Sequence, residues 1–166
     1  LQLIGVNIPF TIGLNNTLNY KNFDLAVFTY GMFNRWKINQ IKSNLGSTSM
    51  RHDLVTLASN VIDDVKERWN SDNQNGTEPS SLQPETIGGT GDFYLEKAWF
   101  IRVRDITLGY TFDSERFSKL KQFRIFCNLA NPFLFTPYTG MDPETDNYLA
   151  AYPNQRTYNL GVNIRF

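Results

Sequence analysis

Apolar and polar residues alternate along five stretches of the chain, a period of two that is typical of β-strands with different surroundings on their two faces. The first two stretches hold about 11 residues each, close to the roughly 9 to 11 that a tilted membrane-spanning strand needs. A two-residue connection separates them, which predicts a tight hairpin. We therefore predict strands at about residues 10–20, 23–33, 98–112, 122–131 and 156–166, the fourth ending where Asn131-Pro132 stops the ladder.

The third predicted strand changes phase once, because the step between its apolar residues Val103 and Ile106 is odd. A β-bulge near Asp105 would shift the register in this way. Alternatively, a regular strand could rise above a bilayer, so that Arg102 and Arg104 face outward into water. The second explanation is favoured, because a strand of this length is longer than a membrane requires.

Two long polar segments, at about residues 34–97 and 132–155, lie between the predicted strands, whereas the other connections are short. Unequal loops of this kind are typical of outer-membrane barrels, in which the long loops are extracellular. Apolar residues at helical spacing predict one amphipathic helix over 54–69, with Asp53 as its N-cap. Carboxylates at alternating positions in the second segment are interpreted as a solvated loop face and not as metal ligands: Asp142, Glu144 and Asp146.

Composition narrows the class of protein. The charged fraction of 19% lies below the roughly 25% of a typical soluble domain, and the aromatic fraction reaches 14%. No apolar run approaches the roughly 18 residues of a transmembrane helix, and zero net charge without a basic cluster argues against nucleic-acid binding. The pattern predicts an all-β protein, a transmembrane antiparallel β-barrel. Because five strands cannot close a barrel, we expect the chain to be part of a larger one. A soluble β-sandwich binding module is the alternative.

The alternation also predicts two sets of functional residues. Toward the end of the chain, apolar residues at every second position lead to a final aromatic residue, which resembles the signal read by the outer-membrane assembly machinery: Tyr158, Leu160, Val162, Ile164 and Phe166. Polar residues on the opposite face would line a lumen: Arg124, Asn128, Asn159 and Asn163. No nucleophile is visibly paired with the single histidine, His52, so neither catalysis nor a metal or cofactor site is predicted.

One segment reads Asp92-Phe93-Tyr94-Leu95-Glu96-Lys97-Ala98-Trp99-Phe100-Ile101-Arg102-Val103-Arg104-Asp105-Ile106-Thr107-Leu108-Gly109-Tyr110-Thr111-Phe112. It resembles the C-terminal signature of the SusC/RagA family of TonB-dependent outer-membrane transporters. Further landmarks are similar and follow in the family's order: Tyr20 to Leu25, Glu67 to Asn73 with Pro79, Tyr138 to Glu144, and Tyr152 to Tyr158. The sequence departs from the family at Arg35-Trp36-Lys37, where a glycine-rich strand end is usual.

The resemblance implies that the chain forms the last five strands of a plugged barrel of about 22 strands in the bacterial outer membrane. Family members import glycans, oligosaccharides or peptides, with a SusD-like lipoprotein as an external lid. TonB energises this import through the periplasm. The plug and the segment that contacts TonB belong to the N-terminal part of such a transporter, which this sequence does not include.

Overall fold

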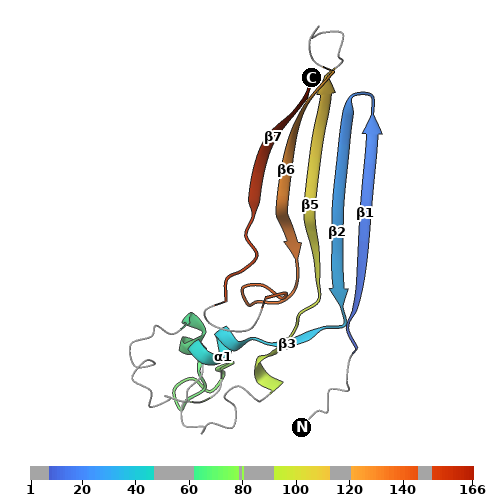
Figure 1. Cartoon of the computed structure of the whole chain (residues 1–166). Coiled ribbons are helices and arrows are strands. Elements are labelled where there is room, and N and C mark those ends of the chain that lie inside the picture. The colour runs from blue at the N-terminus through green and yellow to red at the C-terminus, as the bar shows by residue number, and fades with distance from the viewer. Residues whose placement is uncertain (1–7, 47–61, 79, 81–91, 113–120, 146–150) are drawn as a thin grey trace. The chain divides into compact units, whose positions relative to one another are not determined.

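The computed structural model describes residues 8–46, 62–78, 80, 92–112, 121–145 and 151–166 (Figure 1). The chain divides into two compact units. We call them the sheet unit, which contains 1–35, 98–137 and 154–166, and the loop unit, which contains 36–97 and 138–153. Each unit is described by itself.

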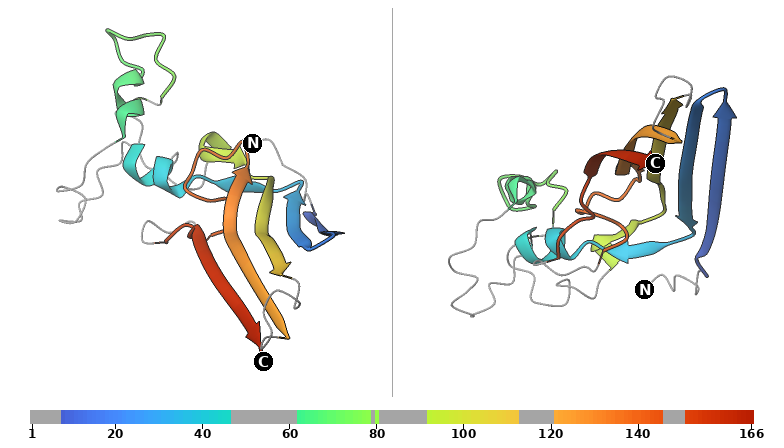
Figure 2. Two further views of the ribbon diagram at one scale, coloured as in Figure 1. Left: turned by 90° about the horizontal axis from the view of Figure 1, so that it is seen from above. Right: turned by 45° about the horizontal axis from the view of Figure 1, so that its top comes forward.

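The sheet unit is a five-stranded antiparallel sheet whose strands lie in the order β1-β2-β5-β6-β7 (Figure 1; Figure 2). The strands are β1 (Phe10–Tyr20), β2 (Phe23–Phe33), β5 (Phe100–Phe112), β6 (Gln122–Phe135) and β7 (Thr157–Arg165). Consecutive strands of this unit are therefore neighbours in space, as in an up-and-down barrel wall.

The ranges of β1 and β2 coincide with the first two predicted strands. Lys21 adopts a left-handed conformation, with φ 52°, in the two-residue turn between them. The structure corrects the end of the fourth predicted strand, because β6 continues through Pro132 to Phe135. Pro132 lies at an irregularity of the β5–β6 ladder, between the pairs Asp105↔Ala130 and Val103↔Phe133, where no ladder hydrogen bond from its nitrogen is needed.

The phase change in the third predicted strand is caused by a register shift, so the favoured explanation of a regular strand is wrong. Asp105 pairs with Phe28 and Val103 pairs with Thr29, which leaves Arg104 as one extra residue on β5. The extra residue brings Val103 to the same face of the sheet as Ile106. Arg102 does not face water, because its residue surface is only 2% exposed.

The loop unit contains short elements: β3 (Trp36–Ile38), α1 (Gln40–Gly46), the 3-10 helices η2 (Asp63–Glu67) and η4 (Asp92–Tyr94), and β4 (Leu95–Lys97). Strands β3 and β4 pair antiparallel in a second, two-stranded sheet. Asn39 caps α1, since its side-chain oxygen accepts a hydrogen bond from Lys42 N at 3.0 Å. All of these elements except η2 fall where the sequence predicts a loop, whereas η2 lies within the helix predicted over 54–69.

The predicted helix over 54–69 is not found in the part of it that the structure describes. Residues 54–61 and the proposed cap Asp53 lie outside the described residues. Beyond them, the 3-10 helix η2 ends at Glu67, and the next residue, Arg68, has an extended backbone. No helix among the described residues has the length and apolar character to cross a membrane.

Candidate functional site

One face of the sheet unit is apolar and open to its surroundings. In the register of the strands, one row crosses the whole sheet through Leu18, Leu25, Leu108, Cys127 and Leu160. The largest exposed fraction in this row is 84%, at Leu160. A β-sandwich would bury such a face against a second sheet, whereas a membrane-spanning wall presents it to lipid.

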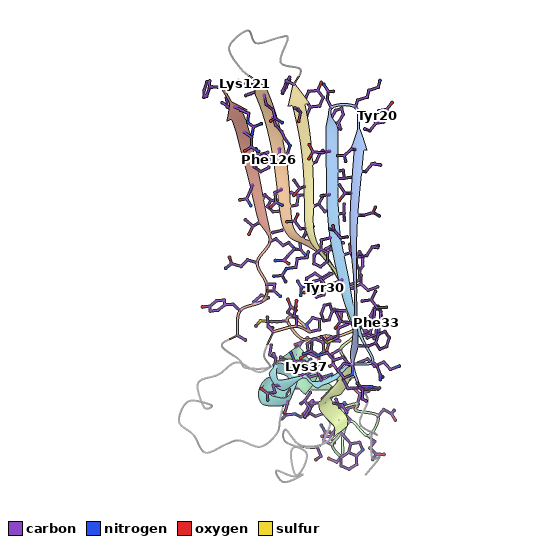
Figure 3. All side chains as sticks on the ribbon, turned by 45° about the vertical axis from the view of Figure 1, so that its right-hand side comes forward. Tyr20, Tyr30, Phe33, Lys37, Lys121 and Phe126 are labelled. Atoms are coloured by element: carbon purple, nitrogen blue, oxygen red, sulfur yellow. The ribbon has the colours of Figure 1, made fainter. Side chains whose placement is uncertain are left out.

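Aromatic residues gather at both ends of this apolar face. Near the β1–β2 turn, ring centroids are 4.7 Å apart for Phe23–Tyr110 and 4.8 Å apart for Tyr110–Phe112. At the other end, the rings of Phe33 and Trp99 are stacked at 6.5 Å. Tyr20 and Phe33 mark the two ends in Figure 3.

The spacing of the two aromatic bands fits a bilayer. Strand β1 has 11 residues, so its ends lie about 33 Å apart along the strand. A tilt of about 40° reduces this to about 25 Å along the membrane normal, the height of the apolar band of outer-membrane barrels. The geometry is therefore that of an outer-membrane barrel wall with aromatic girdles.

The opposite face is polar, and an ion pair crosses three of its strands. Arg124 Nε on β6 donates a hydrogen bond to Asp24 Oδ1 on β2 at 2.9 Å, and its Nη2 donates to Asp24 Oδ2. Gly109 on β5 lies between the two strands, and any β-carbon there would fall within 2.6 Å of Arg124 Nε. The absent side chain of Gly109 thus leaves the space through which the ion pair forms.

A second polar network lies on the same face. Asn128 Nδ2 donates to Asp105 Oδ2 at 2.7 Å and to Thr107 Oγ1 at 2.9 Å, and Thr107 donates to Asp105 Oδ1 at 3.0 Å. Asn159 Nδ2 donates to Asn128 Oδ1 at 3.4 Å across the β6–β7 ladder. Asn163 is the register partner of Arg124. The four residues expected to line a lumen therefore share one face of the sheet.

The residues of the expected assembly signal occupy the other face of β7 and the position after it. Their exposed fractions run from 50% at Ile164 to 84% at Leu160, with Tyr158, Val162 and Phe166 between these values. They continue the apolar face already described, since Leu160 pairs with Cys127 and Val162 with Ile125.

A cluster of aromatic and basic side chains that the alternation did not predict lies on the polar face near the bulge. Tyr30 stacks on Phe28 with centroids 6.0 Å apart and meets Phe100 edge-on at 5.6 Å. The guanidinium groups of Arg102 and Arg104 lie over the rings of Phe100 and Tyr30, at 5.8 and 5.9 Å. The odd step between Val103 and Ile106 was the one signal in the sequence that could have located this cluster.

In the loop unit, the carboxylate of Glu96 accepts hydrogen bonds from two segments. Asn39 Nδ2 donates to Oε1 at 3.1 Å, Thr139 Oγ1 donates to Oε1 at 2.7 Å, and Thr139 N donates to Oε2 at 2.8 Å. Asn39 is itself only 2% exposed. Glu96 therefore connects the segments around residues 39 and 139.

A second charged group in the loop unit is centred on Lys42, whose Nζ lies 3.2 Å from Asp64 and 3.3 Å from Glu78. Burial lowers the pKa of the Lys42 ammonium, but hydrogen bonding and attraction to these two carboxylates outweigh burial and raise the pKa above its ordinary value. Burial also raises the pKa of the Tyr94 phenol, and the nearby charge of Glu78 raises it further.

The predicted solvated face of the second loop is wrong for Asp142, which is only 4% exposed. Its Oδ1 accepts a hydrogen bond from Glu144 N at 2.9 Å, and its carbonyl oxygen accepts one from Thr145 Oγ1 at 3.3 Å. The carboxylate is thus turned inward to support the backbone of the loop. Asp146, like His52, lies outside the described residues.

Among the residues that the structure describes, no three histidine, cysteine or acidic side chains converge as metal ligands would. One open hollow on the sheet has a volume of about 380 Å³ and lies on the apolar face, lined by Leu14, Asn16, Leu18, Leu25, Val27 and Thr29. The chemistry available at the polar face is hydrogen bonding and ion pairing, which suits binding and guidance of a solute more than covalent catalysis.

Solved structures share this fold. The RagAB peptide importer in its "open-open" state matches 95% of the chain with a TM-score of 0.70 and 23% identity. The same importer in its "closed-closed" state matches 94% with a TM-score of 0.69 and 22% identity. The described sheet is therefore part of an antiparallel β-barrel of the RagA type. No protein-family model matches the chain.

Relatives in sequence point to the same class of protein as the solved structures. The TonB-dependent receptor P3 of Formosa agariphila is 28% identical over 99% of the chain, and the TonB-dependent receptor SusC of Bacteroides thetaiotaomicron is 28% identical over 93%. The chain is SusC/RagA-like. This SusC/RagA-like chain spans 17% and 15% of the lengths of those two relatives. Both relatives are named as TonB-dependent receptors, which are not enzymes.

Proposed function

We propose that the chain is a wall segment of a TonB-dependent transporter that imports an oligomeric nutrient, an oligosaccharide or a peptide, across the bacterial outer membrane. The observation that carries the proposal is the exposed apolar face of the sheet between two aromatic bands. At the tilt usual for outer-membrane barrels, strands of 11 residues would hold these bands about 25 Å apart along the membrane normal. In this proposal the β1–β2 turn faces the periplasm and the loop unit is extracellular, because periplasmic turns of such barrels are short.

In the proposed transporter, the polar face of the sheet lines the lumen or meets the plug. Arg124, Asn128, Asn159 and Asn163 then present hydrogen-bonding groups to the interior. A SusD-like lipoprotein is the proposed external partner, and TonB acts through parts of the transporter outside this chain. The names of the relatives support TonB-dependent import, since one relative is the TonB-dependent receptor SusC and a structure of the same fold is the RagAB peptide importer.

The first test uses arginine substitutions on the apolar face. If that face meets lipid, Leu108→Arg or Val162→Arg costs about 2–4 kcal/mol near the bilayer midplane, and Phe112→Arg, in an aromatic band on the same strand as Leu108, costs less. Leu108→Phe is the matched control, which keeps the position apolar. Folding of the isolated chain in water without detergent would favour the alternative of a soluble β-sandwich.

The second test concerns assembly and transport. Deletion of Phe166 is expected to reduce the amount of heat-modifiable barrel in the membrane, if the terminal alternation is an assembly signal. Unchanged assembly would remove that role from Tyr158, Leu160, Val162, Ile164 and Phe166. Uptake of the nutrient should cease in cells that lack TonB. Uptake that continues there would contradict active import.

A further inference from the structure

The bulge in β5 places one extra side chain, that of Arg104, on the polar face of the sheet. Its neighbours Val103 and Asp105 pair with consecutive residues of β2, so Arg104 itself has no register partner there. Bulges often re-aim a side chain beside a functional site. Arg104 is exposed, and its Nη1 donates to the hydroxyl of Tyr30 at 3.5 Å, which orients the guanidinium over the polar-face aromatics.

The aromatic rings of this cluster pack against one another. Tyr30 is nearly parallel to Phe28, at 14°, and nearly perpendicular to Phe100, at 88°. Phe100 is fully buried, whereas Phe28 remains 38% exposed. Figure 3 shows Tyr30 toward the Phe33 end of the sheet, away from the turn near Tyr20. The cluster therefore presents an exposed aromatic surface beside a held guanidinium group.

The carboxylates on the same face are already engaged elsewhere. Both oxygens of Asp105 accept hydrogen bonds, from Thr107 and Asn128, and both oxygens of Asp24 accept from Arg124. Among the described residues, no carboxylate lies within ion-pair distance of Arg104. A guanidinium has five N–H donors, and toward the described residues Arg104 uses one of them, in the hydrogen bond to Tyr30. Arg104 thus has donors available for an anion from outside this sheet.

We propose that Arg104, Tyr30 and Phe28 bind a carboxylate group of the imported oligomer together with the flat or apolar group next to it. A guanidinium suits a carboxylate because it can form two parallel hydrogen bonds. The exposed ring of Phe28 offers a stacking surface to a sugar ring or an apolar side chain. This inference rests on the proposed transport function. It assigns the substrate to a carboxylate-bearing class, either an acidic oligosaccharide or a peptide.

The test measures equilibrium binding to the purified transporter in complex with its lid, and separately measures uptake by cells. The probes are two matched pairs: a pentapeptide with a free C-terminal carboxylate and its C-terminal amide, and a galacturonic acid oligomer and the galactose oligomer of equal length. The wild-type protein is expected to prefer the acidic member of at least one pair. That pair distinguishes a peptide from a sugar as the source of the carboxylate.

Arg104→Gln should weaken binding of the preferred acidic probe about tenfold to a hundredfold and leave its neutral counterpart nearly unchanged. Arg104→Lys keeps the charge without the paired donors and should give an intermediate loss. Phe28→Leu should weaken both members of the pair alike. Arg165→Gln, which removes an exposed arginine near the other end of the sheet, is the control and should change neither.

Three results would overturn the proposal: no preference for an acidic probe in the wild type, an Arg104→Gln variant that binds the acidic probe normally, or an Arg104→Gln variant that loses the same affinity for both members of the pair. If the sole effect of Arg104→Gln is increased leakage of solutes into the cell, the carboxylate that Arg104 binds would belong to the plug and not to the imported oligomer. Failure of the transport function has a different signature, namely probe binding by the purified protein without TonB-dependent uptake.

Discussion

Replacing Gly109 with alanine tests whether the ion pair on the polar face stabilises the sheet. Gly109 is the register partner of Asp24 on β2 and of Phe126 on β6. An added methyl group would lie within 2.6 Å of Arg124 Nε and closer still to Asp24 Oδ1. The two charged side chains would have to separate, since the methyl group would occupy the space between them.

The expected cost follows from the exposure of the pair. The side chains of Arg124 and Asp24 are 21% and 32% exposed, so the pair lies between an exposed ion pair, at about 0–1 kcal/mol, and a shielded charged hydrogen bond, at about 1.5–3 kcal/mol. We take the stabilisation by the Arg124–Asp24 pair as about 2 kcal/mol, within the range of the shielded case. Alanine offsets about 0.5–1 kcal/mol of this, because it has fewer unfolded conformations than glycine. The net destabilisation expected for Gly109→Ala is about 1–1.5 kcal/mol.

Urea unfolding of the purified transporter in detergent measures this cost. Gly13→Ala is the matched control on β1, because a methyl group there would meet the ring of Phe28 at an ordinary 3.7 Å. In a background of Asp24→Asn and Arg124→Gln, Gly109→Ala should cost much less than in the wild type, since the charges are already gone. An equal cost in both backgrounds would refute the role of the ion pair.

Other predictions concern the loop unit. Glu96→Gln should increase hydrogen exchange in α1, because Asn39 loses a charged acceptor, whereas the exposed Glu67→Gln should not; equal exchange in both would contradict the role of Glu96. Lys42→Met should cost about 1–3 kcal/mol of local stability, measured by limited proteolysis, because it removes the cation that pairs with Glu78. Lys66→Met is the control and should leave the proteolysis unchanged, because its ion pair with Asp63 is exposed. Since the pKa of Lys42 is raised, its contribution is complete below its ordinary pKa of 10.5 and is lost as pH rises through the higher folded value. Protease resistance of the wild type should therefore fall in that range, and the fall should be absent in Lys42→Met.

Alternation was sufficient to predict the strands of the sheet, because each has one apolar and one polar face over about nine residues or more. The same pattern placed Arg124, Asn128, Asn159 and Asn163 on one face, since register partners in an antiparallel ladder point to the same side. It could not identify Asp24 as the partner of Arg124. That pairing depends on strand order and on a glycine in the strand between them.

The loop unit was not predictable from local pattern. Strands β3 and β4 have three residues each and α1 has seven, too few for a period to emerge. Their stability depends on contacts between distant residues, such as the hydrogen bond from Asn39 to Glu96, 57 positions away. Asp142 illustrates the same limit: a carboxylate in a polar loop looks solvated, yet it is buried because it supports the backbone of its own turn.

The bulge at Arg104 shows how one inserted residue can satisfy two requirements of a barrel wall. Without it, Val103 would point to the polar face and interrupt the apolar surface that Ile106 and Leu108 continue. With it, the apolar face is continuous along β5, and the irregularity also accommodates Pro132 on β6. The residue left over is an arginine held over Tyr30. The phase change therefore marks the position where the sheet keeps one face apolar and adds a cation to the opposite, polar face.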